Sequence, residues 1–202
     1  GQMYHVTVDN LYLIPTAEVP VTNIFRDVIL SEDELPILLT AYSACFRREA
    51  GSYGKDVRGL NRLHQFNKVE IVCIDKPEHS YEQLDHMVGY VQGLVDKLGL
   101  PWRILRLCGG DISLTYDFEV YSAAQERWLE VSSVSNFESF QANRLKCRYR
   151  NADKKVELCH TLNGSALALP RIVAALLENN QTADGIRIPD CLVPYTGFSM
   201  ID

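Results

Sequence analysis

The chain has 202 residues, of which 47% are hydrophobic, and it carries a formal net charge of −6. This composition excludes disordered and fibrous proteins, and the acidic balance excludes a protein that grips nucleic acid through a uniformly basic surface. No apolar run reaches the roughly 20 residues of a membrane-spanning helix, and the N-terminus lacks a signal-peptide pattern, so we expect a cytoplasmic protein with no membrane partner.

Strand-like segments follow one another along most of the chain, and short polar turns separate several of them. Closely spaced strands pair most easily as antiparallel neighbours, because a parallel return needs a crossover of about a dozen residues or more. We therefore expect a single α+β domain over residues 1–202, in which an antiparallel β-sheet is flanked by helices on one face. The predicted strands cover residues 11–14, 41–49, 62–74, 103–108, 117–123, 128–134 and 156–161.

Two amphipathic helices are predicted, each with apolar residues at spacings of three and four. The first begins with a capping box at Ser80 and ends at Gly99. The second covers residues 165–180, and Pro170 inside this pattern is expected to kink it. Both apolar stripes are assigned to the core, packed against the sheet.

The predicted strand over residues 62–74 carries three chemically different side chains at intervals of four residues. Side chains alternate between the two faces of a strand, so Arg62, Phe66 and Glu70 share one face. A cation can hold phosphate, an aromatic ring can stack on a purine, and a carboxylate can bind an ammonium group. The same pattern also fits an ordinary solvated sheet face.

The preceding strand adds a cation and an anion to this surface. Arg47 and Glu49 have the same parity, so they share a face, and residues 52–61 are predicted to form the loop that leads into Arg62. A guanidinium group offers a planar fork that matches carboxylate or phosphate oxygens. By itself, an Arg-Arg-Glu run is also typical of a surface charge cluster.

Four stretches, in this order along the chain, resemble the motifs of class II aminoacyl-tRNA synthetases in the form seen in seryl-tRNA synthetases. Residues 16–20 (TAEVP) resemble the family's serine-binding loop, residues 46–51 with 62–70 resemble motif 2, residues 130–136 (EVSSVSN) resemble its metal and ATP strand, and residues 161–165 leading to Arg171 resemble motif 3. Together they span almost the whole chain. Four matches in register make coincidence improbable.

The resemblance implies a role for individual residues. Arg47 and Arg171 would be catalytic, acting on the phosphates by position and charge. L-serine would be bound by Thr16, Ala17, Glu18, Arg47, Glu70, Asn163 and Ser165. ATP would be bound by Arg47, Arg48, Glu49, Arg62, Phe66, Glu130, Val131, Ser132, Ser133 and Arg171.

The resemblance also implies that Mg²⁺, which prefers oxygen ligands, is held by Glu130 and Ser133. These two residues have opposite strand parity, so both can face one metal ion only if the backbone bulges or the strand ends between them. No zinc is expected, because the six cysteines are scattered without a C-x-x-C pair, and we expect them to be reduced structural thiols.

Members of this family are longer proteins that charge tRNA(Ser) as homodimers. They carry an N-terminal helical hairpin that grips tRNA and a motif 1 segment that builds the dimer interface. We expect this chain to be a fragment of the catalytic domain that lacks both parts, and that is inactive or weakly active by itself. The predicted activity is ATP-dependent activation of L-serine and its transfer to tRNA(Ser).

Two other functions remain open. The first is an amino acid:carrier-protein ligase of the same fold, which would lack the tRNA-binding arm; the serine-directed Thr16, Glu18 and Ser165 argue against it. The second is a synthetase-like binding or regulatory module without catalysis. Such a module is expected to have lost arginine or glutamate residues of the motifs, and the sequence retains them.

Overall fold

The structure is a computed structural model that describes residues 3–49, 62–107 and 113–202. The predicted loop over residues 52–61 and Cys108, the last residue of a predicted strand, lie outside the described residues.

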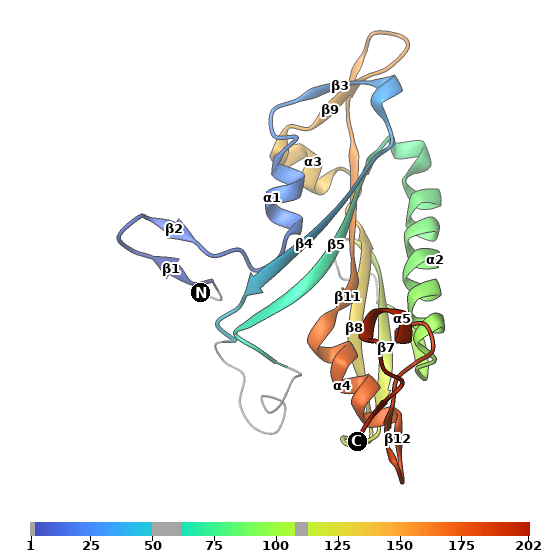
Figure 1. The fold of residues 1–202 in the computed structure, drawn as a ribbon. Helices are drawn as coiled ribbons and strands as arrows, with labels where there is room; N and C mark the ends of the chain where they lie inside the picture. Colours follow the sequence, from blue (N-terminus) through green and yellow to red (C-terminus); the bar gives the residue numbers. More distant parts are fainter. Residues whose placement is uncertain (1–2, 50–61, 108–112) are drawn as a thin grey trace.

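Six strands within the described ranges form one sheet in which all neighbours are antiparallel (Figure 1). From edge to edge they are β4 (Ile37–Phe46), β5 (Gln65–Asp75), β11 (His160–Ala168), β8 (Arg127–Asn136), β7 (Leu114–Ser122) and β6 (Trp102–Arg106). Pairs that are close in the chain are neighbours, as predicted. The late strand β11 enters between β5 and β8 and joins the two halves of the sheet.

Helices cover both faces of this sheet, so the expectation that they lie on one face is wrong. Consecutive residues of a strand point to opposite faces. Accordingly, Cys73 packs in the same cluster as Leu84 of α2 (Ser80–Leu98), whereas Ile74 packs with Ala142 and Leu145 of α3 (Ser139–Leu145). Figure 1 shows α2 along one side and α3, with α1 (Glu18–Asn23), on the other.

The first predicted helix is confirmed as α2, and Gly99 ends it in the left-handed conformation with φ 66°. The capping box is wrong, because no side chain caps the helix and the N-cap is His79. A 3₁₀ turn, η4 (Pro77–His79), precedes the helix. The hydroxyl of Ser80 therefore donates to the carbonyl of Pro77, at 3.1 Å.

The second predicted helix begins later than expected. Ser165 lies in strand β11, opposite Glu70 of β5, and the helix α4 (Leu169–Asn179) follows after a register shift. Pro170 consequently stands in the first turn, where the missing N–H would have no helical partner anyway. Pro170 lies in the first turn and leaves the helix uninterrupted, so the predicted kink is wrong.

The remaining elements are short. The helices α1 and α3 span six and seven residues, which is too short for the periodic pattern that predicts a helix. No helix in the described part of the chain is long and apolar enough to cross a membrane. The other elements are β1 (His5–Val6), β2 (Leu11–Tyr12), β3 (Ile29–Ser31), η1 (Glu32–Glu34), β9 (Arg148–Arg150), β10 (Val156–Leu158), β12 (Gln181–Thr182), β13 (Gly185–Arg187), α5 (Val193–Thr196) and β14 (Met200–Ile201).

Candidate active site

A hollow of about 620 Å³, a volume that includes the solvent space at its opening, lies where β5, β8 and β11 meet the start of α4 and the residues that follow β4. We call it the open hollow. The sequence-predicted residues that line it are Arg47, Glu49, Arg62, Phe66, Glu130, Val131, Ser132, Ser165 and Arg171.

The open hollow is positively charged although the whole chain is acidic. Among the described residues that line it, four carry a positive charge and two a negative charge. Side chains that gather one sign of charge in a cleft raise the local concentration of ligands of the opposite sign. The hollow is therefore suited to a polyanion such as a nucleotide phosphate chain.

Three contacts hold Arg47 in place directly after the end of β4. Its backbone N–H donates to the carbonyl of His64 at 3.0 Å, and its side-chain Nε donates to the carbonyl of Pro15 at 3.3 Å. Its guanidinium carbon lies 5.3 Å from the centroid of the Phe66 ring. The side chain thus joins the loop before α1 to the aromatic face of β5.

The expected strand alternation does not explain how Glu49 and Arg62 reach the site. Strand β4 ends at Phe46, and Glu49 has a left-handed backbone with φ 50°, while Arg62 precedes the start of β5. Arg47 and Glu49 therefore do not share a face of one strand, and Arg62 does not share a strand face with Phe66 and Glu70. Both predictions are wrong. An ion pair of 2.8 Å between the two side chains brings both to the hollow.

Arg171 and Glu130 face each other across the hollow's floor. Arg171 donates to the backbone carbonyl of Glu130 at 2.5 Å, and its Nη1 lies 3.9 Å from Oε2 of the Glu130 carboxylate. Desolvation raises the pKa of Glu130 and Arg171 opposes that rise. Half of the Glu130 side chain is exposed, so water in the hollow weakens the desolvation. Burial lowers the pKa of Arg171, but a guanidinium group stays protonated in proteins.

Strand β8 carries the bulge that the metal-site prediction requires. Glu130 pairs with Glu119 and Ser133 pairs with Asp117, so three steps along β8 match two along β7 and Val131 falls at the extra position. Because directly opposed residues point to the same face, Glu130 and Ser133 share one face. Among the described residues, no group of three or more His, Cys, Asp or Glu side chains is placed to hold a metal ion.

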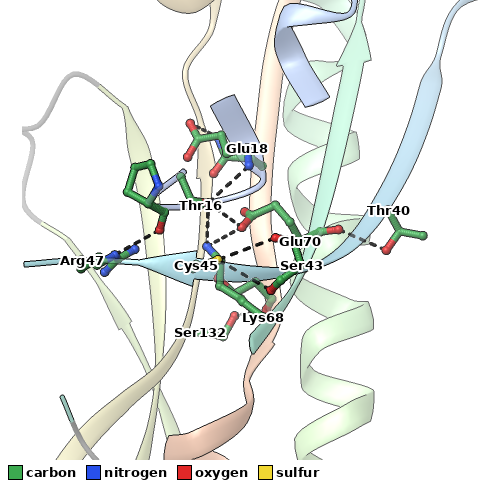
Figure 2. A network of polar contacts seen from close by, with 12 residues as sticks. Thr16, Glu18, Thr40, Ser43, Cys45, Arg47, Lys68, Glu70 and Ser132 are labelled. Atoms are coloured by element: carbon green, nitrogen blue, oxygen red, sulfur yellow. Dashed lines mark hydrogen bonds and ion pairs between the residues drawn. The ribbon is translucent and has the colours of Figure 1, made fainter. Parts of the chain in front are cut away.

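Beside the hollow, a set of buried polar side chains surrounds Glu70, which is 1% exposed. The hydroxyl of Thr16 donates to Oε2 of Glu70 at 3.0 Å, and the same carboxylate oxygen forms an ion pair with Lys68. Lys68 also donates to the Thr16 hydroxyl at 2.9 Å (Figure 2). Burial raises the pKa of Glu70, although the charge and hydrogen bond of Lys68 and the bond from Thr16 lower it.

Glu18 and Asn163 extend this set towards α3. Oε1 of Glu18 accepts hydrogen bonds from Nδ2 of Asn163 at 2.9 Å and from Nε2 of Gln141 at 2.6 Å. The backbone N–H of Glu18 lies 3.3 Å from the Thr16 hydroxyl and donates to it. We call Thr16, Glu18, Lys68, Glu70 and Asn163 the polar cluster.

The structure therefore brings the predicted residues into two adjoining groups. Lys68 belongs to both, since it lines the open hollow and contacts Glu70. Ala17 is buried as the N-cap of α1. Arg48 is exposed, and neither it nor Ser133 is among the residues that line the hollow.

Two residues of the site were not predicted from the sequence. Lys68 lies between Phe66 and Glu70 on β5 and has the same parity, so strand alternation alone could have identified it. Gln141 lies on the short helix α3, and no local pattern points from it to Glu18.

The family pattern described as tRNA synthetase class II core domain (G, H, P, S and T) matches residues 4–180. This chain belongs to the class II tRNA synthetase core family. It is 61% identical over 205 residues to a serine–tRNA ligase from Salinibacter ruber, an alignment that covers 98% of this chain and 48% of that protein. The chain spans about half the length of the curated relatives that it matches.

Two solved structures have the same fold over the whole chain. A seryl-tRNA synthetase from Pyrococcus horikoshii, complexed with ATP, is 40% identical with a TM-score of 0.93, and 47% of that chain is covered. A cytoplasmic serine-tRNA ligase from Naegleria fowleri, in complex with AMP, is 32% identical with a TM-score of 0.92, and 50% of that chain is covered. The resemblance to class II synthetases of the seryl type is confirmed.

Proposed function

We propose that this chain forms the catalytic site of a serine–tRNA ligase, which activates L-serine with ATP and releases pyrophosphate. One observation carries the proposal: a positively charged hollow with an aromatic wall adjoins a buried carboxylate cluster, and Lys68 belongs to both. Serine–tRNA ligases among the relatives, and ATP and AMP in two similar structures, support the same function.

The polar cluster is the proposed site of the amino acid. A carboxylate such as Glu70 attracts an ammonium group, and the hydroxyl of Thr16 and the amide of Asn163 can hydrogen-bond a small polar side chain. Such a site rejects alanine, because the missing hydroxyl leaves buried polar groups unpaired. Ser165 lies opposite Glu70 on the neighbouring strand and lines the hollow, so it can meet the same ligand.

The open hollow is the proposed site of ATP. Phe66 offers the ring for the adenine base, Glu49 can accept hydrogen bonds from its amino group, and Arg62 and Arg171 suit the outer phosphates. In the reaction, a carboxylate oxygen of serine forms a bond to the α-phosphorus, and the bond from that phosphorus to the departing pyrophosphate breaks. Arg47 lines the open hollow and donates to Pro15, next to Thr16 of the polar cluster, so it can neutralise the charge that develops on the α-phosphate.

Mg²⁺ is the proposed companion of ATP. Oxygen donors on Glu130 and Ser133, placed on one face by the bulge at Val131, fit a hard cation. Few protein ligands are needed, because Mg²⁺ keeps several waters and binds mainly to substrate phosphates. When bound, the ion neutralises phosphate charge and orients the leaving group.

The complete protein is proposed to transfer the activated serine to tRNA(Ser), to act as a homodimer and to work in the cytoplasm. The described residues would then be part of one catalytic domain. These proposals rest on the identity of the chain to serine–tRNA ligases of about twice its length.

The direct test is exchange of labelled pyrophosphate into ATP, measured on the complete protein with serine, threonine or alanine as the amino acid. Serine is expected to support exchange and the other two are not. Exchange with alanine or threonine but not with serine would overturn the substrate assignment. Absence of exchange with every amino acid would instead favour a binding or regulatory module, and exchange without charging of tRNA would favour a carrier-protein ligase.

A further inference from the structure

Lys68 is a buried cation at the boundary between the polar cluster and the open hollow. Its side chain is only 9% exposed, and its ammonium group contacts the Thr16 hydroxyl and the Glu70 carboxylate. Lysine is almost never buried to this degree without a partner. A buried ion pair gives little net stability compared with a well-packed apolar pair, so its presence inside a site points to a functional role.

The contacts of Glu70 are confined to one side of its carboxylate. Within the described ranges, the hydrogen bond from Thr16 and the ion pair with Lys68 both fall on Oε2, and no other side chain donates to the carboxylate. Two contacts to one oxygen fix the rotation of the carboxylate group. The other oxygen, Oε1, has no side-chain donor among the described residues.

Lys68 also counters the environment that disfavours a charged Glu70. Burial raises the pKa of this carboxyl and the nearby Glu18 raises it further, whereas Lys68 lowers it by its charge and its hydrogen bond. The residues opposite Glu70 on the neighbouring strands, Ala41 and Ser165, are uncharged. Lys68 is thus the positive charge that acts on Glu70.

We infer that Lys68 is a positioning residue for the amino acid substrate, which holds Glu70 as an oriented anion with Oε1 directed to the substrate's ammonium group. The inference rests on the proposed function, because it requires an amino acid in the polar cluster. Lys68 itself takes no part in the bond changes.

The test compares the parent protein with Lys68→Met in the pyrophosphate exchange assay, using the complete protein between about pH 6 and about pH 8. In the variant, Glu70 must lose its proton before it can bind an ammonium group. The KM for serine of the variant should therefore exceed the parent value at about pH 6 and fall as the pH rises, because the deprotonated fraction of Glu70 increases. The parent KM for serine should stay flat, and the KM for ATP should stay unchanged in both. A variant KM for serine equal to or below the parent value at every pH would overturn the inference.

Two further variants separate charge from packing. Lys68→Arg retains a positive charge, so it should restore the flat pH profile, and a steep profile like that of Lys68→Met would contradict the inference. Lys155→Met makes the same chemical change at an exposed position on the turn before β10 and should leave serine and ATP kinetics unchanged.

If Lys68→Met fails to fold, a second comparison still tests the inference, because neither of its variants contains an unpaired buried carboxylate. The double variant Lys68→Met/Glu70→Gln should have a serine KM no higher than that of Glu70→Gln, and both should be independent of pH, because Lys68 acts through the charge of Glu70 and an unpaired Lys68 repels the substrate's ammonium group. A further loss in the double variant would overturn the inference. If the parent itself shows no serine-dependent exchange, the proposed function fails. If the parent exchanges with serine but the variants do not show the KM values expected above, the inference alone fails.

Discussion

The polar cluster and the open hollow lie side by side but differ in their access to water. The side chains of Glu70 and Lys68 are 2% and 9% exposed, whereas those of Arg62 and Glu130 are 41% and 50% exposed. Inside a protein, hydrogen bonds and charges act more strongly, and an unpaired polar group costs more than it does near solvent. The cluster is therefore built to discriminate a small ligand, and the hollow to gather a large charged one.

Exposed charges are screened by salt over about 8 to 10 Å, so no single group in the open hollow is expected to dominate the binding of a nucleotide. Several moderate contacts must act together there. In the cluster each contact depends on its neighbours, as the shared Oε2 of Glu70 illustrates. Variants in the two regions should therefore differ in size of effect and in which substrate they affect.

The largest effect is expected at Arg47, which lines the open hollow and donates to the carbonyl of Pro15, the residue before Thr16 of the polar cluster. Arg47→Ala should lower kcat/KM by about 10³-fold, because it removes the charge next to the reacting phosphate. The fold should remain intact, as a thermal unfolding measurement can check. The matched control is Arg150→Ala, an exposed arginine of β9 outside the site, which should retain activity. Full activity in Arg47→Ala would refute the proposed mechanism.

The next effect is expected in the polar cluster. Glu70→Gln keeps the size of the side chain but removes its charge, so kcat/KM for serine should fall about 10²-fold, a typical loss for a buried charge-assisted hydrogen bond. The KM for ATP, determined in the same assay, should not change. An equal loss for both substrates would mean that the two regions do not have separate roles.

The smallest effect is expected at the exposed edge of the open hollow. Arg62→Gln should raise the KM for ATP about tenfold at low ionic strength and less at high salt, because the charge is screened. Since the Arg62 side chain of the pair with Glu49 is 41% exposed, the free energy of unfolding should change by less than about 1 kcal/mol. A loss that is independent of salt would show that Arg62 acts as a buried group.

Much of this site could be predicted from the sequence, since side chains on one strand have fixed relative positions. The alternation along β5 placed Phe66 and Glu70 together, and the same rule would have included Lys68. The helix α2 was predictable because its apolar stripe runs from Leu84 to Leu98, over about four turns. Where strands end or bulge, local periodicity fails: the bulge at Val131 and the late start of α4 follow from pairing with β7 and β5.

Contacts between distant segments were beyond the reach of the sequence. Glu18 and Asn163 are 145 residues apart and yet share a hydrogen bond, because β11 enters the sheet next to β5 and α1 lies against β5. The family resemblance grouped these two residues without giving the geometry. It also gave no role to Gln141, which holds the same carboxylate.

The central claim is that the buried cluster receives the amino acid and the open hollow receives the nucleotide. A crystal structure of the complete protein with a non-hydrolysable seryl-adenylate analogue tests it most directly. We expect the seryl ammonium group at Oε1 of Glu70 and the adenine ring against Phe66, with Arg47 at the phosphate. A ligand bound in the opposite direction, or outside the two regions, would contradict it.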